Sequence, residues 1–321
     1  MIAELLQREI ALGTFPGASW AVGSSRGIDQ TGAVGHAVTV PLRIPATTET
    51  IYDCASLTKV LVTTPRALER FSLDHVIHGF TVHELLTHTS GLRAWLPLYA
   101  FDDPLRAILE QGPECERGTR VIYSDLNFIL LWMAMDKFTL ERPADKPRIA
   151  ATEWGQRWEM KMCAELFGAQ GAECRAQKRD DFFLRSALSA LRTDLIWGET
   201  HDGNSHFLGN GCAGNAGLFA TATEVFEMTR SVLARTPPVR NETAHLNDAR
   251  GLGWQMGTGS AMTEMLSPGN FGHTGFTGTS VWIDPARDKI MVLLTNRVHP
   301  CATPNAMLRV RGEFHRLALA E

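Results

Sequence analysis

The chain has 321 residues, a formal net charge of −4 at pH 7, 44% hydrophobic residues and 21% charged residues. This balance is typical of a globular enzyme-sized protein and gives no electrostatic case for binding a nucleic acid or an anionic membrane. No apolar run reaches the roughly 18 residues that a membrane span needs, and residues 1–8 lack the regions of a signal peptide. We therefore expect a cytoplasmic protein, or a periplasmic one whose leader has been removed.

The chain opens with a predicted helix over residues 2–13, followed by a predicted hairpin with strands at 18–22 and 27–35. The turn of this hairpin, residues 23–27, matches the Gly-x-Ser-x-Gly pattern of a nucleophile elbow. Such an elbow needs a strand before the serine and a helix after it. Because a strand follows here, the pattern favours an ordinary hairpin turn.

Ser56 and Lys59 stand three positions apart where a helical segment is predicted to begin. Positions i and i+3 lie on one face of a helix, so the amine of Lys59 can reach the hydroxyl of Ser56. A serine becomes an effective nucleophile when a nearby base takes its proton. The pair therefore points to a Ser-x-x-Lys nucleophile, although the same spacing also arises by chance on an exposed helix face.

Six cysteines are scattered along the chain without the spacing of a metal site, and we expect reduced thiols. Cys54, two residues before Ser56, is a rival nucleophile, but the spacing places no base beside it. Burial near the site is its expected role. His83 and His88 are five apart rather than the four of a zinc-binding helix, so their side chains diverge. We predict no metal and no other cofactor.

Tyr123 is predicted to lie on a loop that enters a buried helix, because Ser124 and Asp125 are followed by the apolar residues of 126–131. Loops on a rigid support are common places for functional side chains. The alternative is structural, with the Tyr123 ring packed inside and Ser124 or Asp125 capping the helix.

A Gly-rich segment, residues 271–278, contains His273, Thr274, Gly275 and Phe276 and precedes predicted strands within 278–296. Glycines allow the backbone to come close to a ligand. The alternative is a Gly-rich hairpin with an incidental histidine. The segment lacks the glycine spacing and the strand–helix context of a dinucleotide-binding loop, so no nucleotide is expected.

In this order, Ser-x-x-Lys, a tyrosine loop and His-Thr-Gly resemble the triple signature of the serine β-lactamase and penicillin-binding-protein superfamily. Residues 81–92 and 214–222 resemble further segments of that superfamily, and residues 271–300 are similar to a peptidase-like and esterase-like branch. The resemblance covers most of residues 1–137 and 196–321.

The resemblance implies a mixed α/β (α+β) fold, in which an antiparallel sheet flanked by terminal helices meets an all-helical region. Helical patterns between about 60 and 235, and a predicted helix over 303–320, agree with it. We expect residues 1–55 and 236–321 to form the sheet region and residues 56–235 the mainly helical region, with the active site at their junction.

Three positions depart from the superfamily pattern: Asp125 replaces a frequent Asn, His273 a frequent Lys, and Asn215 a frequent His. The middle of the chain also departs. Residues 139–147 are expected to form a shorter connection than usual, and residues 159–192 an insertion. Because that region normally borders the substrate cleft, the resemblance does not fix the substrate.

The resemblance implies acyl transfer, in which Ser56 attacks a carbonyl while Lys59 and Tyr123 share the proton transfers. The backbone N–H groups of Ser56 and Phe276 are expected to stabilise the oxyanion, each contributing roughly 3–4 kcal/mol. The sequence does not decide whether Lys59 or Tyr123 is the general base. His273 is expected to contact the substrate or the tyrosine and to titrate near pH 6–7.

Asp125 is expected to orient either the substrate or Lys59, and Thr274 and Gly275 to border the substrate. With His273 in place of a lysine, we favour an amidase, peptidase or esterase over a true β-lactamase. The expected substrate is a D-amino-acid peptide or cell-wall fragment, or else a small ester. The alternatives are a carboxylesterase with little peptidase activity, a true β-lactamase, and a non-catalytic sensor or scaffold.

Overall fold

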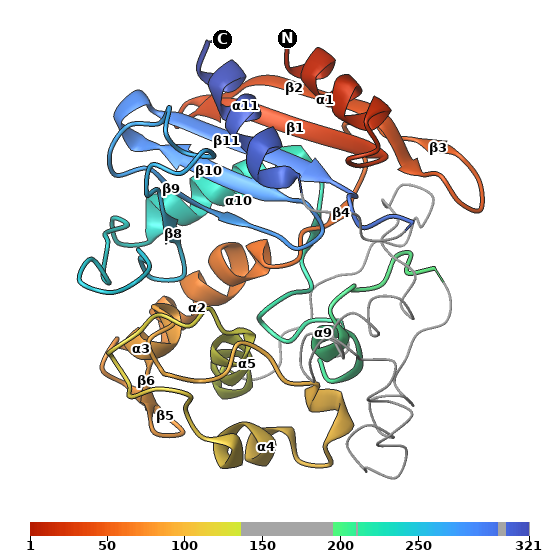
Figure 1. The fold of residues 1–321 in the computed structure, drawn as a ribbon. Helices are drawn as coiled ribbons and strands as arrows, with labels where there is room; N and C mark the ends of the chain where they lie inside the picture. The colour runs from red at the N-terminus through yellow and green to blue at the C-terminus, as the bar shows by residue number, and fades with distance from the viewer. Residues whose placement is uncertain (136–194, 210, 301–305, 321) are drawn as a thin grey trace.

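The computed structural model describes residues 1–135, 195–209, 211–300 and 306–320 (Figure 1). An open sheet at one end of the molecule stands above a group of helices at the other, and the chain passes between them several times. The mixed α/β fold expected from the sequence is confirmed. The predicted short connection and the predicted insertion, residues 139–147 and 159–192, lie outside the described residues.

Within the described residues, seven strands form the main sheet, and every pair of neighbours is antiparallel. In sheet order they are β3 (Ile44–Pro45), β2 (Gly27–Val38), β1 (Gly17–Ser24), β11 (Lys289–Thr295), β10 (Ser280–Asp284), β9 (Phe271–Thr274) and β8 (Gln255–Met256). The predicted hairpin is β1–β2, and its turn contains the serine of the Gly-x-Ser-x-Gly pattern. That pattern is therefore a hairpin turn, as predicted.

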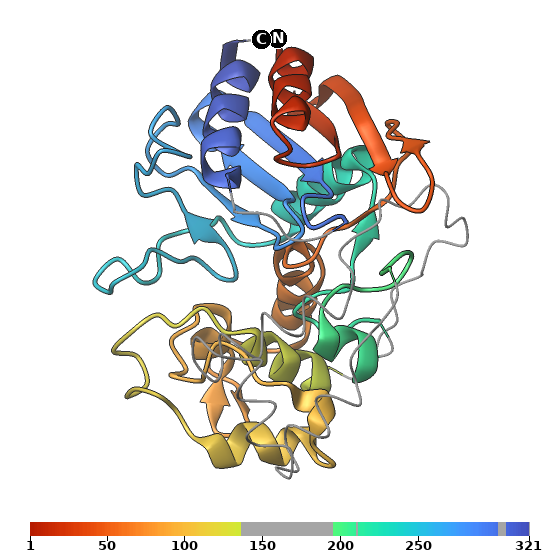
Figure 2. The ribbon, with the colours of Figure 1, turned by 45° about the vertical axis from the view of Figure 1, so that its right-hand side comes forward.

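Helices cover both faces of the sheet (Figure 2). α1 (Ile2–Ala11) and α11 (Met307–Ala320) pack on one face together with Trp20. α10 (Ala222–Arg235) packs on the other face, in the core that contains Ala21. Adjacent residues of a strand point to opposite faces, which is why Trp20 and Ala21 belong to different cores.

The position of α10 corrects one detail of the sequence interpretation, which placed residues 222–235 in the helical region. Phe226 of α10 lies in the same core as Val281 and Val292 of the sheet. The helix begins at a capping box in which Thr221 and Glu224 bond reciprocally to each other's backbone N–H. The division of the chain into two regions otherwise stays a prediction.

The helical region surrounds α5 (Asp125–Ala134), whose residues 126–132 are all buried. A helix that is apolar on every side belongs at the centre of a core, and α3 is among the elements packed against it. The other described elements of this region are η1 (Lys59–Thr63), α2 (Thr64–Arg70), β5 (Val76–Ile77), β6 (Phe80–Thr81), α3 (Val82–Leu86), η2 (Leu98–Ala100), α4 (Pro104–Gln111) and α9 (Gly203–Phe207).

A two-stranded pair joins the two regions, β4 (Tyr52–Asp53) with β7 (Phe219–Ala220). One short turn, η4 (Pro285–Arg287), connects β10 to β11. Within the described part of the chain, no helix has both the length and the apolar character that crossing a bilayer requires.

Candidate active site

Ser56 and Lys59 lie where the chain leaves β4 and enters the helical segment η1–α2. Lys59 Nζ donates a hydrogen bond of 2.9 Å to Ser56 Oγ, so the predicted reach across one helical turn is present. The Lys59 side chain is fully buried, whereas Ser56 is partly exposed. The hydroxyl therefore lies at an accessible position with the lysine behind it.

The backbone immediately before Ser56 is held in an unusual conformation. Ala55 has a φ of 47°, in the left-handed region that non-glycine residues rarely adopt. Its N–H donates to Asp53 Oδ1 over 2.8 Å, and its carbonyl accepts from the Thr58 hydroxyl over 2.7 Å. These two bonds hold the turn that presents Ser56.

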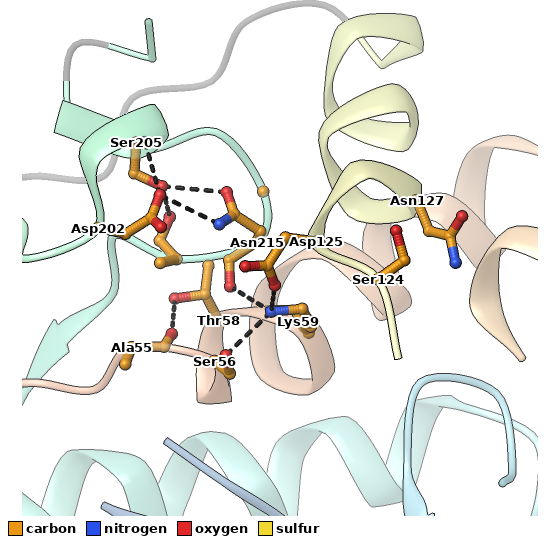
Figure 3. Close-up of polar contacts among 12 residues, drawn as sticks. Ala55, Ser56, Thr58, Lys59, Ser124, Asp125, Asn127, Asp202, Ser205 and Asn215 are labelled. Carbon is orange, nitrogen blue, oxygen red and sulfur yellow. Dashed lines mark hydrogen bonds and ion pairs between the residues drawn. The ribbon is translucent and has the colours of Figure 1, made fainter. Parts of the chain in front are cut away.

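Lys59 Nζ lies among three oxygen atoms (Figure 3). It donates hydrogen bonds to Ser56 Oγ and to the Asn215 carbonyl, both over 2.9 Å, and forms an ion pair of 2.7 Å with the Asp125 carboxylate. A negative charge this close favours the protonated form of the lysine.

The pKa of Lys59 also indicates that its side chain is protonated. Burial alone would lower the pKa of Lys59, but the Asp125 carboxylate and the neighbouring Tyr123 side chain outweigh it, and the pKa is raised above its usual value. Lys59 is therefore an ammonium before the reaction begins. It can accept the Ser56 proton only as it passes one of its own protons to a neighbour.

Tyr123 lies on the loop before α5, as predicted, and its ring centroid is 5.1 Å from Lys59 Nζ. The guanidinium of Arg250 lies 5.3 Å from the same ring. Cations at this distance from an aromatic face are attracted to it. The structure thus brings Ser56, Lys59 and Tyr123 together, and Asp125 with them.

His88 supports the tyrosine loop, a role that the sequence interpretation did not assign. Its Nδ1 accepts the backbone N–H of Ser124 over 3.0 Å, and its ring lies 4.7 Å from that of Tyr123. The Asn127 amide is also 3.2 Å from Nδ1. Residues 81–92, which contain His88, had been noted as resembling a family segment, and that was the available signal.

The Gly-rich segment is attached to the chain just before Ser56 by two buried hydrogen bonds. The Thr277 hydroxyl donates to the Asp53 carbonyl over 2.7 Å, and the Thr279 hydroxyl donates to the Cys54 carbonyl over 3.0 Å. A Cβ at Gly275 would lie 2.7 Å from the same Cys54 carbonyl, so only glycine permits this approach. Segments at opposite ends of the chain therefore meet beside the nucleophile.

Phe276, whose N–H is the predicted second oxyanion donor, follows Gly275 in this segment. Its ring stacks on His201 with centroids 5.4 Å apart, and the Arg297 guanidinium lies 4.9 Å from it. Thr274, at the end of β9, is partly buried, and its carbonyl lies 2.8 Å from His273 Nδ1. The oxyanion role of Ser56 and Phe276 stays a prediction.

His273 is brought to the site, with its ring 5.8 Å from that of Tyr123. The expectation that it titrates near pH 6–7 is wrong. Burial, the ammonium of Lys59 and the guanidinium of Arg250 all hold the pKa of His273 well below its ordinary value. The imidazole is neutral at these pH values, and burial beside two cations could not be read from the sequence.

Cys54 is fully buried, and its pKa is raised well above the usual value by burial and by Asp53. A protonated buried thiol is a poor nucleophile, which supports the structural role expected for it. Among the described residues, no group of three or more His, Cys, Asp or Glu side chains could hold a metal ion.

A cluster of three polar residues lies behind Lys59 (Figure 3). The sequence analysis had not assigned these residues to one site. Asp202 and Ser205 of the α9 segment both bond to the side chain of Asn215. Asn215 had been noted only as a departure from a family pattern. Asp202 and Ser205 lie in a part of the chain where we identified no motif from the sequence.

Comparison with known proteins identifies a family that matches this chain. A family model described as Beta-lactamase matches residues 2–314. A putative D-alanyl-D-alanine carboxypeptidase of Escherichia coli (strain K12) is 25% identical over 324 residues, covering 81% of this chain and 72% of the relative. An N-acetylmuramyl-L-alanine amidase of Bacillus subtilis (strain 168) is 26% identical over 362 residues, covering 93% of this chain and 80% of the relative.

Among solved structures, a β-lactamase from Mycobacterium bovis has a TM-score of 0.55 and 18% sequence identity, and the match covers 98% of both chains. At this identity the likeness concerns the fold alone. The β-lactamase/transpeptidase fold expected from the sequence is confirmed.

Proposed function

The chain belongs to the Beta-lactamase family, and from this premise we propose that it is a serine hydrolase that cleaves an amide or ester bond through an acyl-enzyme on Ser56. One observation carries the proposal. The Lys59 ammonium contacts both Ser56 Oγ and the Asp125 carboxylate, next to the Tyr123 ring. This cluster supplies a nucleophile, a path for its proton and a fixed charge.

The protonation state of Lys59 defines the proton path in this proposal. As Ser56 Oγ bonds to the substrate carbonyl carbon, its proton passes to Lys59, Lys59 passes one of its own protons to the Tyr123 oxygen, and the phenolic proton of Tyr123 passes in the same step to the leaving nitrogen or oxygen. The bond between that atom and the carbonyl carbon then breaks. Water then attacks the acyl-enzyme along the reverse path. The number of protons on the three groups is the same before and after the cycle.

Two backbone N–H groups, those of Ser56 and Phe276, are proposed to receive the negative oxygen of the tetrahedral intermediate. The bonds from Thr277 and Thr279 to the chain before Ser56 support this assignment, because they fix one donor segment against the other. Preorganised donors lower the barrier because they do not have to reorient during the reaction.

The favoured substrate is a D-amino-acid peptide or another cell-wall fragment. The carboxypeptidase and amidase relatives support this class by their names. Asp125 is engaged with Lys59, so its contact supports a role in holding the lysine more than one in reading a substrate N–H group.

A carboxylesterase is the second candidate, and His273 favours it. A lysine at this position would offer a positive charge to a substrate carboxylate, whereas the buried His273 is neutral near pH 7. The neighbouring cation, Arg250, is already paired with Asp248 over 2.7 Å. Neither His273 nor Arg250 therefore offers an unpaired positive charge to a substrate carboxylate, which favours small uncharged esters.

The test is intact-mass spectrometry and turnover with three substrates: a p-nitrophenyl ester, a D-alanyl-D-alanine peptide and a β-lactam. A transient acyl adduct with turnover supports the hydrolase, and the substrate with the highest kcat/KM decides between the two candidates. A stable adduct without turnover indicates a sensor. No adduct with any of them contradicts the proposal.

Fluorophosphonate labelling identifies the nucleophile. Ser56→Ala should abolish labelling. Ser25→Ala is the matched control, since Ser25 is the exposed serine of the Gly-x-Ser-x-Gly turn and its hydroxyl donates to Asp288 at the surface. Labelling that persists in Ser56→Ala, or that disappears in Ser25→Ala, contradicts the assignment.

A further inference from the structure

The three groups that contact Lys59 Nζ differ in how they are fixed. Ser56 Oγ is the reacting atom, and Asp125, the ion-pair partner, is part of α5. The third group is the backbone carbonyl of Asn215, which lies on a loop between α9 and β7. The direction of the ammonium toward Ser56 therefore depends on what holds this loop carbonyl in place.

The Asn215 side chain is held at both ends. Its amide Nδ2 donates to Asp202 Oδ1 over 3.1 Å, and its Oδ1 accepts from the Ser205 hydroxyl over 3.1 Å. The Ser205 hydroxyl also lies 3.2 Å from the Ala216 carbonyl, the next one along the loop. Rotation of Asn215 would break these bonds and move its carbonyl away from Lys59.

Asp202 is itself well fixed. Its Oδ1 accepts the backbone N–H of Ser205 over 2.8 Å and so caps the start of α9. Asn215 and Ser205 are buried, with 1% and 0% of their surface exposed. Burial and the negative charge of Asp125 raise the pKa of Asp202, and Lys59 acts in the opposite direction. The carboxyl group is therefore within electrostatic range of the Lys59–Asp125 pair.

We propose that Asp202, Ser205 and Asn215 form a positioning clamp that holds the Asn215 carbonyl against Lys59 and thereby keeps the ammonium directed at Ser56. The clamp acts through Lys59 and touches no substrate. This inference rests on the proposed serine-hydrolase function.

The experiment measures kcat and KM of purified variants on the best substrate of the panel described above. Asp202→Ala and Asn215→Ala should each lower kcat by about 10- to 100-fold, because a small misplacement of a reacting group has an effect of this size. KM should stay within about twofold. The double variant should be no slower than the slower single variant, since both substitutions release the same carbonyl.

Two further variants separate positioning from a general loss of structure. Asp202→Asn keeps an oxygen for both N–H donors and should restore kcat to within about threefold. Asp103→Ala is the matched control, because Asp103 caps α4 in the same way, by accepting the Arg106 N–H over 2.9 Å. It should leave kcat unchanged.

Each possible result either supports or contradicts the proposed clamp. Full kcat in both alanine variants, or an equal loss in Asp103→Ala, overturns the clamp. Asn215→Ala also covers the case in which Asp202→Ala does not fold, since it leaves the α9 cap in place. Ser56→Ala is measured in parallel: if it is active, the serine-hydrolase proposal fails, whereas an inactive Ser56→Ala with fully active clamp variants overturns the clamp alone.

Discussion

The ammonium of Lys59 and the carboxylate of Asp125 form an ion pair of 2.7 Å, in which the lysine is fully buried and one fifth of the Asp125 side chain is exposed. The pair raises the pKa of Lys59 despite its burial. A raised pKa means that the pair stabilises the fold from neutral pH up to the unfolded pKa of lysine, about 10.4, and that this contribution is lost as the pH rises through the folded value.

Asp125→Asn should therefore destabilise the protein at pH 7. Removing one partner leaves a buried charge without its counter-ion, and we expect the free energy of unfolding to fall by about 3 kcal/mol. Urea denaturation measures it. Glu110→Gln is the control, because it removes an exposed ion pair with Arg106 and should change stability by about 0.5 kcal/mol or less. Equal effects of the two substitutions would contradict the role of Asp125.

Thr277→Val should lower kcat more than it raises KM. The substitution keeps the shape of the side chain but removes the 2.7 Å bond to the Asp53 carbonyl, so the Gly-rich segment is less firmly held beside Ser56. We expect a loss of about 1–2 kcal/mol in stability and about tenfold in kcat. Steady-state kinetics and thermal unfolding measure the two effects.

The matched control for that prediction is Thr229→Val. The Thr229 hydroxyl is equally buried and donates to the Val225 carbonyl over 2.7 Å, but it lies within α10. A similar loss of stability with unchanged kcat is expected. If both valine variants lose the same activity, the bond from Thr277 has no particular function at the site.

Cys54→Ala should keep fluorophosphonate labelling and at least about one third of kcat. The thiol is buried and its raised pKa keeps it protonated, so it takes no part in the chemistry. Mass spectrometry of the labelled protein checks the result. Loss of labelling in a folded Cys54→Ala variant, with Ser56 intact, would show that the thiol is needed.

Stability should fall as the pH decreases below about 6.5. Burial lowers the pKa of His315 to about 4, so between these pH values the unfolded chain binds a proton that the folded protein does not. His315→Gln should reduce the slope of the free energy of unfolding against pH by up to about 1.4 kcal/mol per pH unit. Urea denaturation between pH 4.5 and 7.5 measures it, and an unchanged slope would contradict the prediction.

The sequence was sufficient for the parts of the site that depend on local geometry. Spacing along one helical turn predicted the contact between Ser56 and Lys59, and the apolar run after Asp125 predicted that Tyr123 lies at the entrance to a buried helix. The order of the motifs, together with their resemblance to a family, predicted that His273 joins them. Family resemblance also predicted the fold, which periodicity alone would not have done.

The parts that were missed depend on contacts between distant segments. His88 was considered only as a metal ligand, and its bond to the tyrosine loop needs the folded helical region. Asp202 and Ser205 act on Lys59 through Asn215, and no local pattern marks such a relationship. The titration of His273 was predicted wrongly because a reference pKa takes no account of burial beside two cations.

The interior position of β1 has a consequence for synthesis on the ribosome. β1 pairs on one edge with β2, which follows it directly, and on the other with β11, from Ala18 opposite Thr295 to Gly23 opposite Ile290. In a nascent chain the second edge stays open until the late strands emerge. Open edges invite pairing with other chains, so this edge is protected only after residues 289–295 have been synthesised.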